Sequence, residues 1–244
     1  MVFYLAKGAP DTCGQGCNEW IAADGFIDVA ATQRLRALLA RLRGTKPPIF
    51  FNSNGGSQTQ AMAIGRLIRE RGMTAGVWRT VPDGCATLDE KACRQLTQSG
   101  EMLTATLRSG AICLSSCVYA LLGGTARQVP PGASLVVHIS RLVQLRPDGN
   151  AVTLPLDTAA RRKQLAVLND ALRTYIQSMG IDRRLFELIL KTPHEQRHSL
   201  SRDEIATFGI DAREWSCSTP VRCATPGAIP PPARPSKSEP AASR

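Results

Sequence analysis

A serine-bearing turn and a later histidine are the residues of this sequence best suited to chemistry. Ser115 lies in Cys113-Leu114-Ser115-Ser116-Cys117, between a short apolar run and an expected small-residue helix. His138 ends an expected strand further along the chain, which has only three histidines. A serine becomes a nucleophile when a nearby base accepts its proton, and histidine is the most common base. Ser115 and His138 are therefore our candidate nucleophile and base for acyl transfer.

Acyl transfer also needs N–H donors that stabilise the developing oxyanion. Gly55 and Gly56 follow an apolar run expected to form a buried strand, and Ser57 after them is an expected helix cap. Glycines permit close backbone approach, and a helix start offers unpaired N–H groups. Gly55, Gly56 and Ser116 are therefore candidate oxyanion donors. Each motif alone also fits a plain tight turn or a helix N-cap.

The elements that must position these residues alternate between strand and helix. Strand patterns at 20–27, 49–51 and 74–78 alternate with helical patterns at 29–43, where Asp28 is the expected cap, and 57–72. This alternation predicts an α/β domain with parallel strand pairing. Beyond His138 we expect a hairpin over 142–156 and a long helix over 157–179. Two further helices are expected, one over 182–190 with Asp182 as its cap and one that begins with a capping box at Ser201.

Two segments depart from the alternation. Residues 81–109 carry Cys85 and Cys93 and are interpreted as an insertion closed by a disulfide. Residues 218–244 are rich in Pro, Ser and Ala, a composition that cannot bury a core and is typical of a disordered tail. The sequence thus predicts one domain over 1–217.

Cysteine usage indicates the compartment. The eight cysteines fall in close pairs: Cys13, Cys17, Cys85, Cys93, Cys113, Cys117, Cys217 and Cys223. An even, paired set favours disulfides and a periplasmic or otherwise extracytoplasmic location. Zinc is the alternative, but no CxxC spacing and no histidine accompany the pairs, so we expect no metal. Pairing of Cys113 with Cys117, or of both with Cys85 and Cys93, would brace the Ser115 turn.

The N-terminus and the charge bear on export and on partners. The first residues, MVFYLAKG, lack the basic and apolar regions of a signal peptide. This conflicts with the extracytoplasmic location that the paired cysteines indicate, unless the start of the sequence is trimmed or misassigned. No apolar run is long enough to span a membrane.

The net charge of +10 comes from scattered arginines without interleaved aromatic residues. We therefore expect no nucleic-acid partner, whereas an anionic membrane surface stays an alternative.

Three motifs in order resemble the Clp-protease/crotonase superfamily: N-S-N-G-G-S, S-S-C-V-Y-A-L-L-G-G and P-G-A-S-L-V-V-H. The C-x-S-x-C motif is similar to that of its extracytoplasmic Clp-like branch. The resemblance implies a repeated β-β-α superhelix with C-terminal helices, and homo-oligomers assembled through those helices. It also implies Ser115 as nucleophile, His138 as base, Gly55 and Gly56 at the oxyanion turn, a peptide or protein substrate, and no cofactor.

One position departs from the family pattern. The segment in which the family carries an orienting aspartate is Lys191-Thr192-Pro193-His194-Glu195 here, so Thr192, His194 and Glu195 are candidates for that role. Loss of the orienting acid costs a triad about 10⁴-fold in turnover. The leading hypothesis is thus an ATP-independent serine peptidase with a Ser–His dyad. The alternatives are a weak or inactive scaffold on the same fold and, disfavoured by the disulfides, acyl-CoA chemistry.

Overall fold

Strand–helix alternation builds a seven-stranded sheet in this computed structural model, which describes residues 1–145, 151–211, 216–219 and 222–224. The strand order is β5 (Arg79–Pro82), β6 (Leu103–Arg108), β1 (Val2–Lys7), β2 (Glu19–Asp24), β3 (Ile49–Asn52), β4 (Thr74–Val77) and β8 (Ala126–Gln128). Strands β2, β3, β4 and β8 pair in parallel, as do β1 and β6, while β1–β2 and β5–β6 are antiparallel. The expected α/β class is confirmed.

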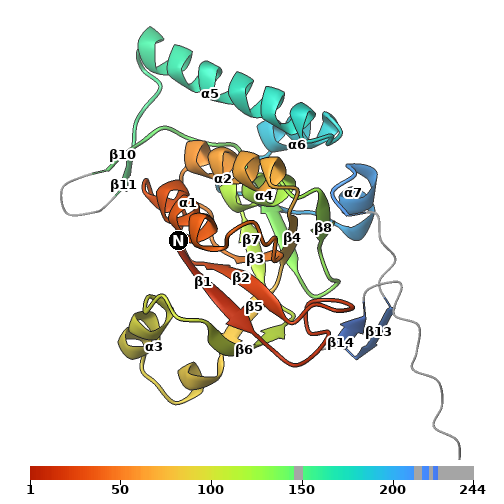
Figure 1. Cartoon of the computed structure of the whole chain (residues 1–244). Helices are drawn as coiled ribbons and strands as arrows, with labels where there is room; N and C mark the ends of the chain where they lie inside the picture. Colours follow the sequence, from red (N-terminus) through yellow and green to blue (C-terminus); the bar gives the residue numbers. More distant parts are fainter. Residues whose placement is uncertain (146–150, 212–215, 220–221, 225–244) are drawn as a thin grey trace, which may run out of the picture.

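The helices lie mainly on one side of this sheet (Figure 1). That side carries α1 (Ala31–Arg41), α2 (Gln58–Glu70) and α4 (Ser116–Leu122), with α5 (Ala159–Ser178), α6 (Arg184–Lys191) and α7 (Arg202–Thr207) beyond them. Helix α3 (Glu90–Thr97) and the short 3₁₀ helix η1 (Asp83–Ala86) lie on the other side. The expected C-terminal helices are therefore present.

Two glycines let the helices that start at the candidate site pack closely. A Cβ at Gly65 of α2 would lie 1.8 Å from the hydroxyl of Tyr175, and one at Gly123 would lie 2.1 Å from the Gly65 carbonyl oxygen. The Tyr175 hydroxyl donates to the Tyr119 carbonyl at 2.6 Å. Because α2 follows the Gly55-Gly56 turn and α4 follows Ser115, this contact fixes the two turns relative to each other.

The sheet is buried on both faces. Ile21 and Ala23 of β2 pack in the large core under the helices, and Trp20 and Ala22 of the same strand pack in a second cluster. Alternate side chains of a strand point to opposite faces, so a strand between two layers is apolar throughout. The second cluster occupies the face that α3 and the β5–β6 ribbon cover, and Trp20 donates to the Thr80 hydroxyl at 2.9 Å.

A second sheet carries the candidate nucleophile and base. Its order is β12 (His198–Ser199), β9 (Ser134–Val137) and β7 (Ile112–Leu114). Strands β7 and β9 are parallel, with Leu114 opposite Val136, and β12 is antiparallel to β9. Ser53 extends β3 alongside β7, since its N–H donates to Ile112 and its carbonyl accepts from Leu114.

Several expectations about individual elements need correction. The N-terminal residues form β1 inside the main sheet. Residues 81–109 supply β6 and half of β5 to that sheet, as well as the disulfide-closed segment around α3. The expected helix caps also differ: Ala30 and Arg183 occupy the N-cap positions of α1 and α6, while Asp28 and Asp182 accept from backbone N–H groups two residues ahead. The caps at Ser57 and Ser201 are confirmed.

The expected hairpin after His138 is present as β10 (Val143–Leu145) and β11 (Ala151–Thr153), and its turn at 147–150 lies outside the described residues. Most of the expected disordered tail, 218–244, also lies outside the described residues. The described part of this region forms two short strands, β13 (Ser216–Thr219) and β14 (Arg222–Ala224), which pair so that Cys217 lies opposite Cys223. Among the described residues, no helix is long and apolar enough to cross a bilayer.

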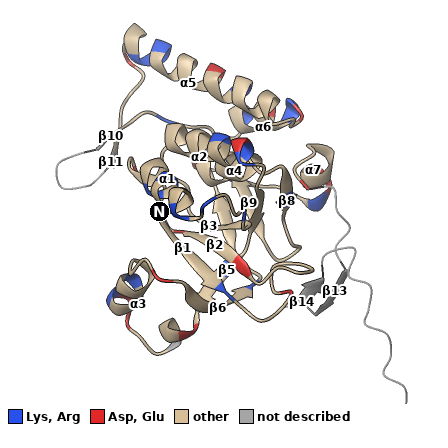
Figure 2. Ribbon diagram, viewed as in Figure 1, with Lys and Arg blue, Asp and Glu red and all other residues tan. Residues whose placement is uncertain are grey.

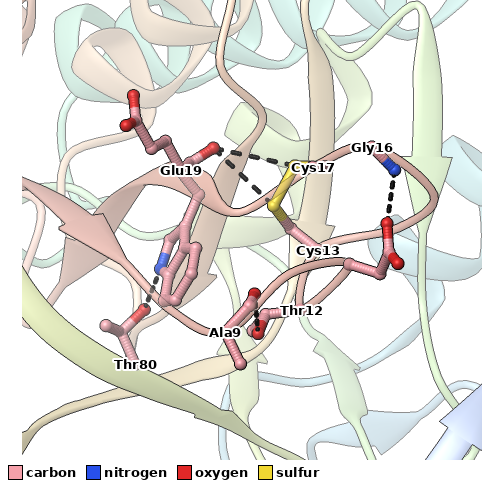
Figure 3. Close-up of a disulfide and its surroundings, with 9 residues drawn as sticks. Ala9, Thr12, Cys13, Gly16, Cys17, Glu19 and Thr80 are labelled. Carbon is pink, nitrogen blue, oxygen red and sulfur yellow. Dashed lines mark hydrogen bonds between the residues drawn. A yellow bond between two sulfur atoms is a disulfide. The ribbon is translucent and has the colours of Figure 1, made fainter.

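Three disulfides are present within the described residues, and each joins cysteines that are close in sequence. They link Cys13 to Cys17, Cys85 to Cys93, and Cys113 to Cys117, with Cα–Cα distances of 5.1, 5.0 and 5.2 Å. Figure 3 shows the first, which closes the turn between β1 and β2. Disulfides persist in oxidising compartments, so their number favours an extracytoplasmic environment.

Candidate functional site

Ser115 occupies a strained position between β7 and α4. Its φ of 57° and ψ of −125° lie in a region that non-glycine residues rarely adopt. Such strain, of order 1–3 kcal/mol, persists where the surroundings enforce it and is common at functional sites. A serine on a sharp strand-to-helix turn is also the geometry of a nucleophile elbow, which exposes the hydroxyl. Ser115 is half-buried, whereas Ser116 is fully buried.

The Cys113–Cys117 disulfide spans the Ser115 turn. Both cysteines are fully buried, one in β7 and the other in the first turn of α4. On the strand side, the Ser115 N–H donates to the Val136 carbonyl at 2.7 Å. The turn is thus held at both ends, by a covalent bond and by the neighbouring strand. The bracing expected from the cysteine spacing matches this arrangement.

The Gly55-Gly56 turn lies directly against the Ser115 turn. A Cβ at Gly55 would lie 2.6 Å from the Leu114 carbonyl oxygen and 3.0 Å from the Ser115 Cβ. The N–H of Gly55 donates to the Ser53 hydroxyl at 3.1 Å, so that donor is already used. Within the described residues, the N–H groups of Gly56 and Ser116 have no acceptor. Of the three candidate N–H groups that the sequence suggested, these two therefore remain free.

His138 follows β9, the parallel neighbour of the strand that leads to Ser115. Because Leu114 pairs with Val136, Ser115 and His138 both lie just past the carboxyl ends of adjacent strands. The ring is buried, and its Nδ1 lies 2.9 Å from the Ile139 carbonyl oxygen. A proton on Nδ1 would be donated there and would leave the Nε2 lone pair free to accept a proton.

The three candidates for orienting His138 have different surroundings. The hydroxyl of Thr192 donates to the Leu188 carbonyl at 2.8 Å, one turn back in α6. Glu195 is exposed, and its carboxylate lies 4.0 Å from the Arg141 guanidinium. The ring of His194 packs edge-on against His138 with a centroid distance of 4.1 Å. The carbonyl of Thr192 accepts from the N–H of Ile139 at 2.9 Å, next to the base. Of the three candidate side chains, that of His194 is in contact with the His138 ring.

Burial lowers the pKa of His138 below its ordinary value of 6.5. The Ile139 carbonyl acts in the opposite direction, whereas the positive charge of His194, Arg197 and Arg141 lowers the pKa further. The ring is therefore neutral at pH 7, the form that accepts a proton. The cost of this environment is that an imidazolium formed during a reaction receives little stabilisation.

This pKa makes a prediction for pH dependence. His138 loses its function as base when it is protonated, so activity should fall as the pH drops through its lowered pKa. We expect the acidic limb of kcat/KM to have its midpoint below pH 6.5. Replacing His194 by Ala removes a positive neighbour and admits water, which should move that midpoint upward. Steady-state rates between pH 4.5 and 8 test this, and a wild-type midpoint above 6.5 would contradict it.

No protein-family model matches the sequence, and no curated protein matches it. Solved structures do align, each over 78% of this chain. A serine-to-alanine mutant of the 1510-N membrane-bound stomatin-specific protease aligns over 75% of its length at 16% identity with a TM-score of 0.48. ClpP1 from Listeria monocytogenes aligns over 87% of its length at 14% identity with a TM-score of 0.49. At these values, function must be argued from the geometry of the site.

Two groups of the site have roles that the sequence does not indicate. Ser53 is buried, donates to the Gly25 carbonyl at 2.7 Å, and accepts from Gly55, so it fixes the glycine turn. The carbonyl of Ile139 is the hydrogen-bond partner of His138, and a backbone group cannot be identified from residue type.

Within the described part of the chain, no group of three His, Cys, Asp or Glu side chains could hold a metal.

Proposed function

We propose that this chain is a serine hydrolase of the Clp-protease/crotonase type, an ATP-independent peptidase in which Ser115 is the nucleophile and His138 the base. The N–H groups of Gly56 and Ser116 would hold the oxyanion. The single observation that carries the proposal is the strained conformation of Ser115, next to two free N–H groups on adjoining turns. A fluorophosphonate probe, which reacts with activated serines, tests it by labelling the purified protein.

In the proposed reaction, Ser115 Oγ attacks the carbonyl carbon of a peptide bond while its proton passes to Nε2 of His138. The oxyanion forms beside the N–H groups of Gly56 and Ser116, each such donor being worth about 3 kcal/mol of barrier. The imidazolium then protonates the leaving amine, and water hydrolyses the acyl-enzyme with His138 again as base.

A weakly active or inactive scaffold is the second candidate, favoured by the surroundings of His138. The neighbouring charges that act on its pKa are all positive, and its Nδ1 partner is a carbonyl. A carboxylate would both orient the ring and stabilise its charged form. This candidate predicts no labelling of the wild-type protein by the probe, together with a function that survives loss of the Ser115 hydroxyl.

We also propose a periplasmic or other extracytoplasmic location, where the Cys113–Cys117 disulfide supports the nucleophile. Replacing both cysteines by Ala should lower the free energy of unfolding by about 2 kcal/mol and slow labelling of Ser115. The pair Cys13 and Cys17 is a matched control, because its sequence separation is also 4. Its replacement should cost similar stability in urea unfolding and leave the labelling rate unchanged. Equal labelling by both double variants would contradict the bracing role.

We further propose that the chain forms homo-oligomers through α5 and α6. Helix α5 has 20 residues, of which only Leu172, Tyr175 and Ile176 are buried, and Val167 is 60% exposed. Val167→Asp would place a charge in such an interface and should shift the mass measured by light scattering toward the monomer. A wild-type protein that is monomeric at micromolar concentration would contradict this proposal.

A further inference from the structure

A cavity of about 930 Å³ lies beside the candidate site, on the side of the sheet that carries α3. One wall comes from the segment that includes α3, which the Cys85–Cys93 disulfide closes; both cysteines line the cavity. The opposite wall comes from the start of β1 and the residues after β2. The disulfide fixes the α3 wall, so the cavity is a preformed space.

Three lining segments connect this cavity to the oxyanion turn. Phe26 and Asp28 flank Ile27, whose N–H donates to the Gly55 carbonyl and whose carbonyl accepts from the Ser57 N–H, both at 2.8 Å. Asn52 precedes the same turn, and its side chain accepts from the N–H of Ile112 at 3.2 Å. Ile112 is three residues before Ser115. The cavity wall is therefore directly connected to the strands and turns that carry the candidate site.

The part of the cavity nearest the turn is apolar and exposed. Phe26 is 59% exposed and Ile112 is 41% exposed, although most large apolar side chains of this protein are buried. Exposed apolar side chains that line a cavity are typical of binding sites, because a ligand removes them from water. A bulky apolar side chain of a substrate would be buried between Phe26 and Ile112.

Carboxylates outnumber cations along the lining, although the protein as a whole has a net charge of +10; Figure 2 shows residues of both charges on α3. The cationic groups are the N-terminal ammonium of Met1 and the guanidinium groups of Arg79 and Arg94. The lining carboxylates are those of Asp24, Asp28, Asp89 and Glu90. Three of these carboxylates have local roles: Glu90 pairs with Arg94, Asp28 pairs with Arg34 and with the N-terminal ammonium of Met1, and Asp89 caps α3. Asp24 is exposed and has no ion-pair partner among the described residues.

A neighbouring side chain holds the Asp24 carboxylate in place. Its carboxylate accepts from the Asn52 side chain at 2.8 Å. Tyr4 is only 4% exposed and lines the cavity, and its hydroxyl has no hydrogen bond within the described part of the chain. Burial and the nearby charge of Asp24 raise the pKa of Tyr4, so its hydroxyl stays protonated. A fixed carboxylate beside a free hydroxyl suits an ammonium or guanidinium group.

We propose that this cavity is the substrate-specificity site, and that it binds an unfolded polypeptide with a bulky apolar side chain next to a Lys or Arg. The apolar side chain lies between Phe26 and Ile112, and the cation binds Asp24. The proposal rests on the proposed hydrolase function, since it takes the polypeptide to be the substrate. Its binding step can nevertheless be measured without catalysis.

Binding is therefore tested on the Ser115→Ala protein, using two fluorescein-labelled six-residue peptides. One has Phe followed by Lys among alanines, and in the other norleucine replaces Lys. We expect the Lys peptide to bind about 10-fold more tightly, and Asp24→Asn to abolish that difference. Asp83→Asn is the matched control, because Asp83 is exposed but does not line the cavity. Equal affinities of the two peptides, or no effect of Asp24→Asn, would overturn the proposal.

The binding of the apolar side chain is tested by a separate variant and its matched control. Phe26→Ser should weaken both peptides about 10-fold, whereas Val29→Ser should not, because Val29 is 67% exposed on the same loop and does not line the cavity. Fluorophosphonate labelling of the protein with Ser115 intact separates the two proposals. Labelling with unselective peptide binding would refute the specificity site alone. Selective binding without labelling would refute the hydrolase and leave a peptide-binding protein.

Discussion

Replacement of Ser115 by Ala should abolish fluorophosphonate labelling and lower peptidase activity by at least about 10³-fold. The Oγ atom forms the acyl bond, so no neighbouring group can replace it. The fold should be retained, because the Cys113–Cys117 disulfide and the N–H of Ser115 do not involve this hydroxyl. Ser116→Ala is the matched control, because the buried Ser116 hydroxyl has no hydrogen-bond partner among the described residues. That variant should keep its activity.

Ser115→Gly separates a nucleophile from a serine that only begins a helix. Glycine adopts a φ of 57° freely, so this variant should lose labelling and yet gain about 1 kcal/mol of stability in urea unfolding. The Ser115 hydroxyl accepts no capping hydrogen bond in α4, which removes the usual reason for a serine at this position. Labelling that persists in either Ser115 variant would show that the nucleophile lies elsewhere.

The sequence predicts the elements around the site well, because their signals are local. Ser57 and Ser201 cap their helices as their positions suggest, and the apolar run 49–51 forms the buried β3. Strand β1 is not predicted from the sequence, because its six residues show no periodicity of their own. Its place in the sheet is set by pairing with β2, the next strand along the chain, and with β6, which is distant in sequence. Residues 81–109 look like an insertion for a similar reason, because β6 joins the sheet through β1.

In the candidate site, too, the local features can be predicted from the sequence, whereas those that depend on tertiary contacts cannot. Serine, histidine and glycine in order can be found by residue type, but which N–H groups remain free depends on tertiary contacts. Gly55 and Gly56 look alike in sequence, yet the Ser53 hydroxyl takes the N–H of Gly55 and leaves that of Gly56. The partner of the His138 ring is likewise a backbone carbonyl, that of the adjacent Ile139, whereas the sequence suggested side chains from the segment 191–195.

Gly56→Ala should abolish activity and lower the free energy of unfolding by about 3 kcal/mol. A Cβ at this position would lie 2.2 Å from the Ile27 carbonyl oxygen and 2.8 Å from its carbon, and both are backbone atoms held by hydrogen bonds to the glycine turn. The backbone φ of 142° is also unfavourable for alanine. Relief of the contact would move the Gly56 N–H away from the position where the oxyanion forms.

The control for this substitution is Gly44→Ala. Gly44 also has a positive φ, of 93°, but a Cβ there would meet nothing within 4 Å. It should therefore show only the cost of the backbone conformation, about 1 kcal/mol in urea unfolding, with unchanged kcat/KM. Activities are compared at a temperature where circular dichroism shows both variants folded, so that lost activity reports the turn and not the fold. A folded Gly56→Ala protein with wild-type kcat/KM would exclude this N–H from the oxyanion site and leave Ser116 as its only proposed donor.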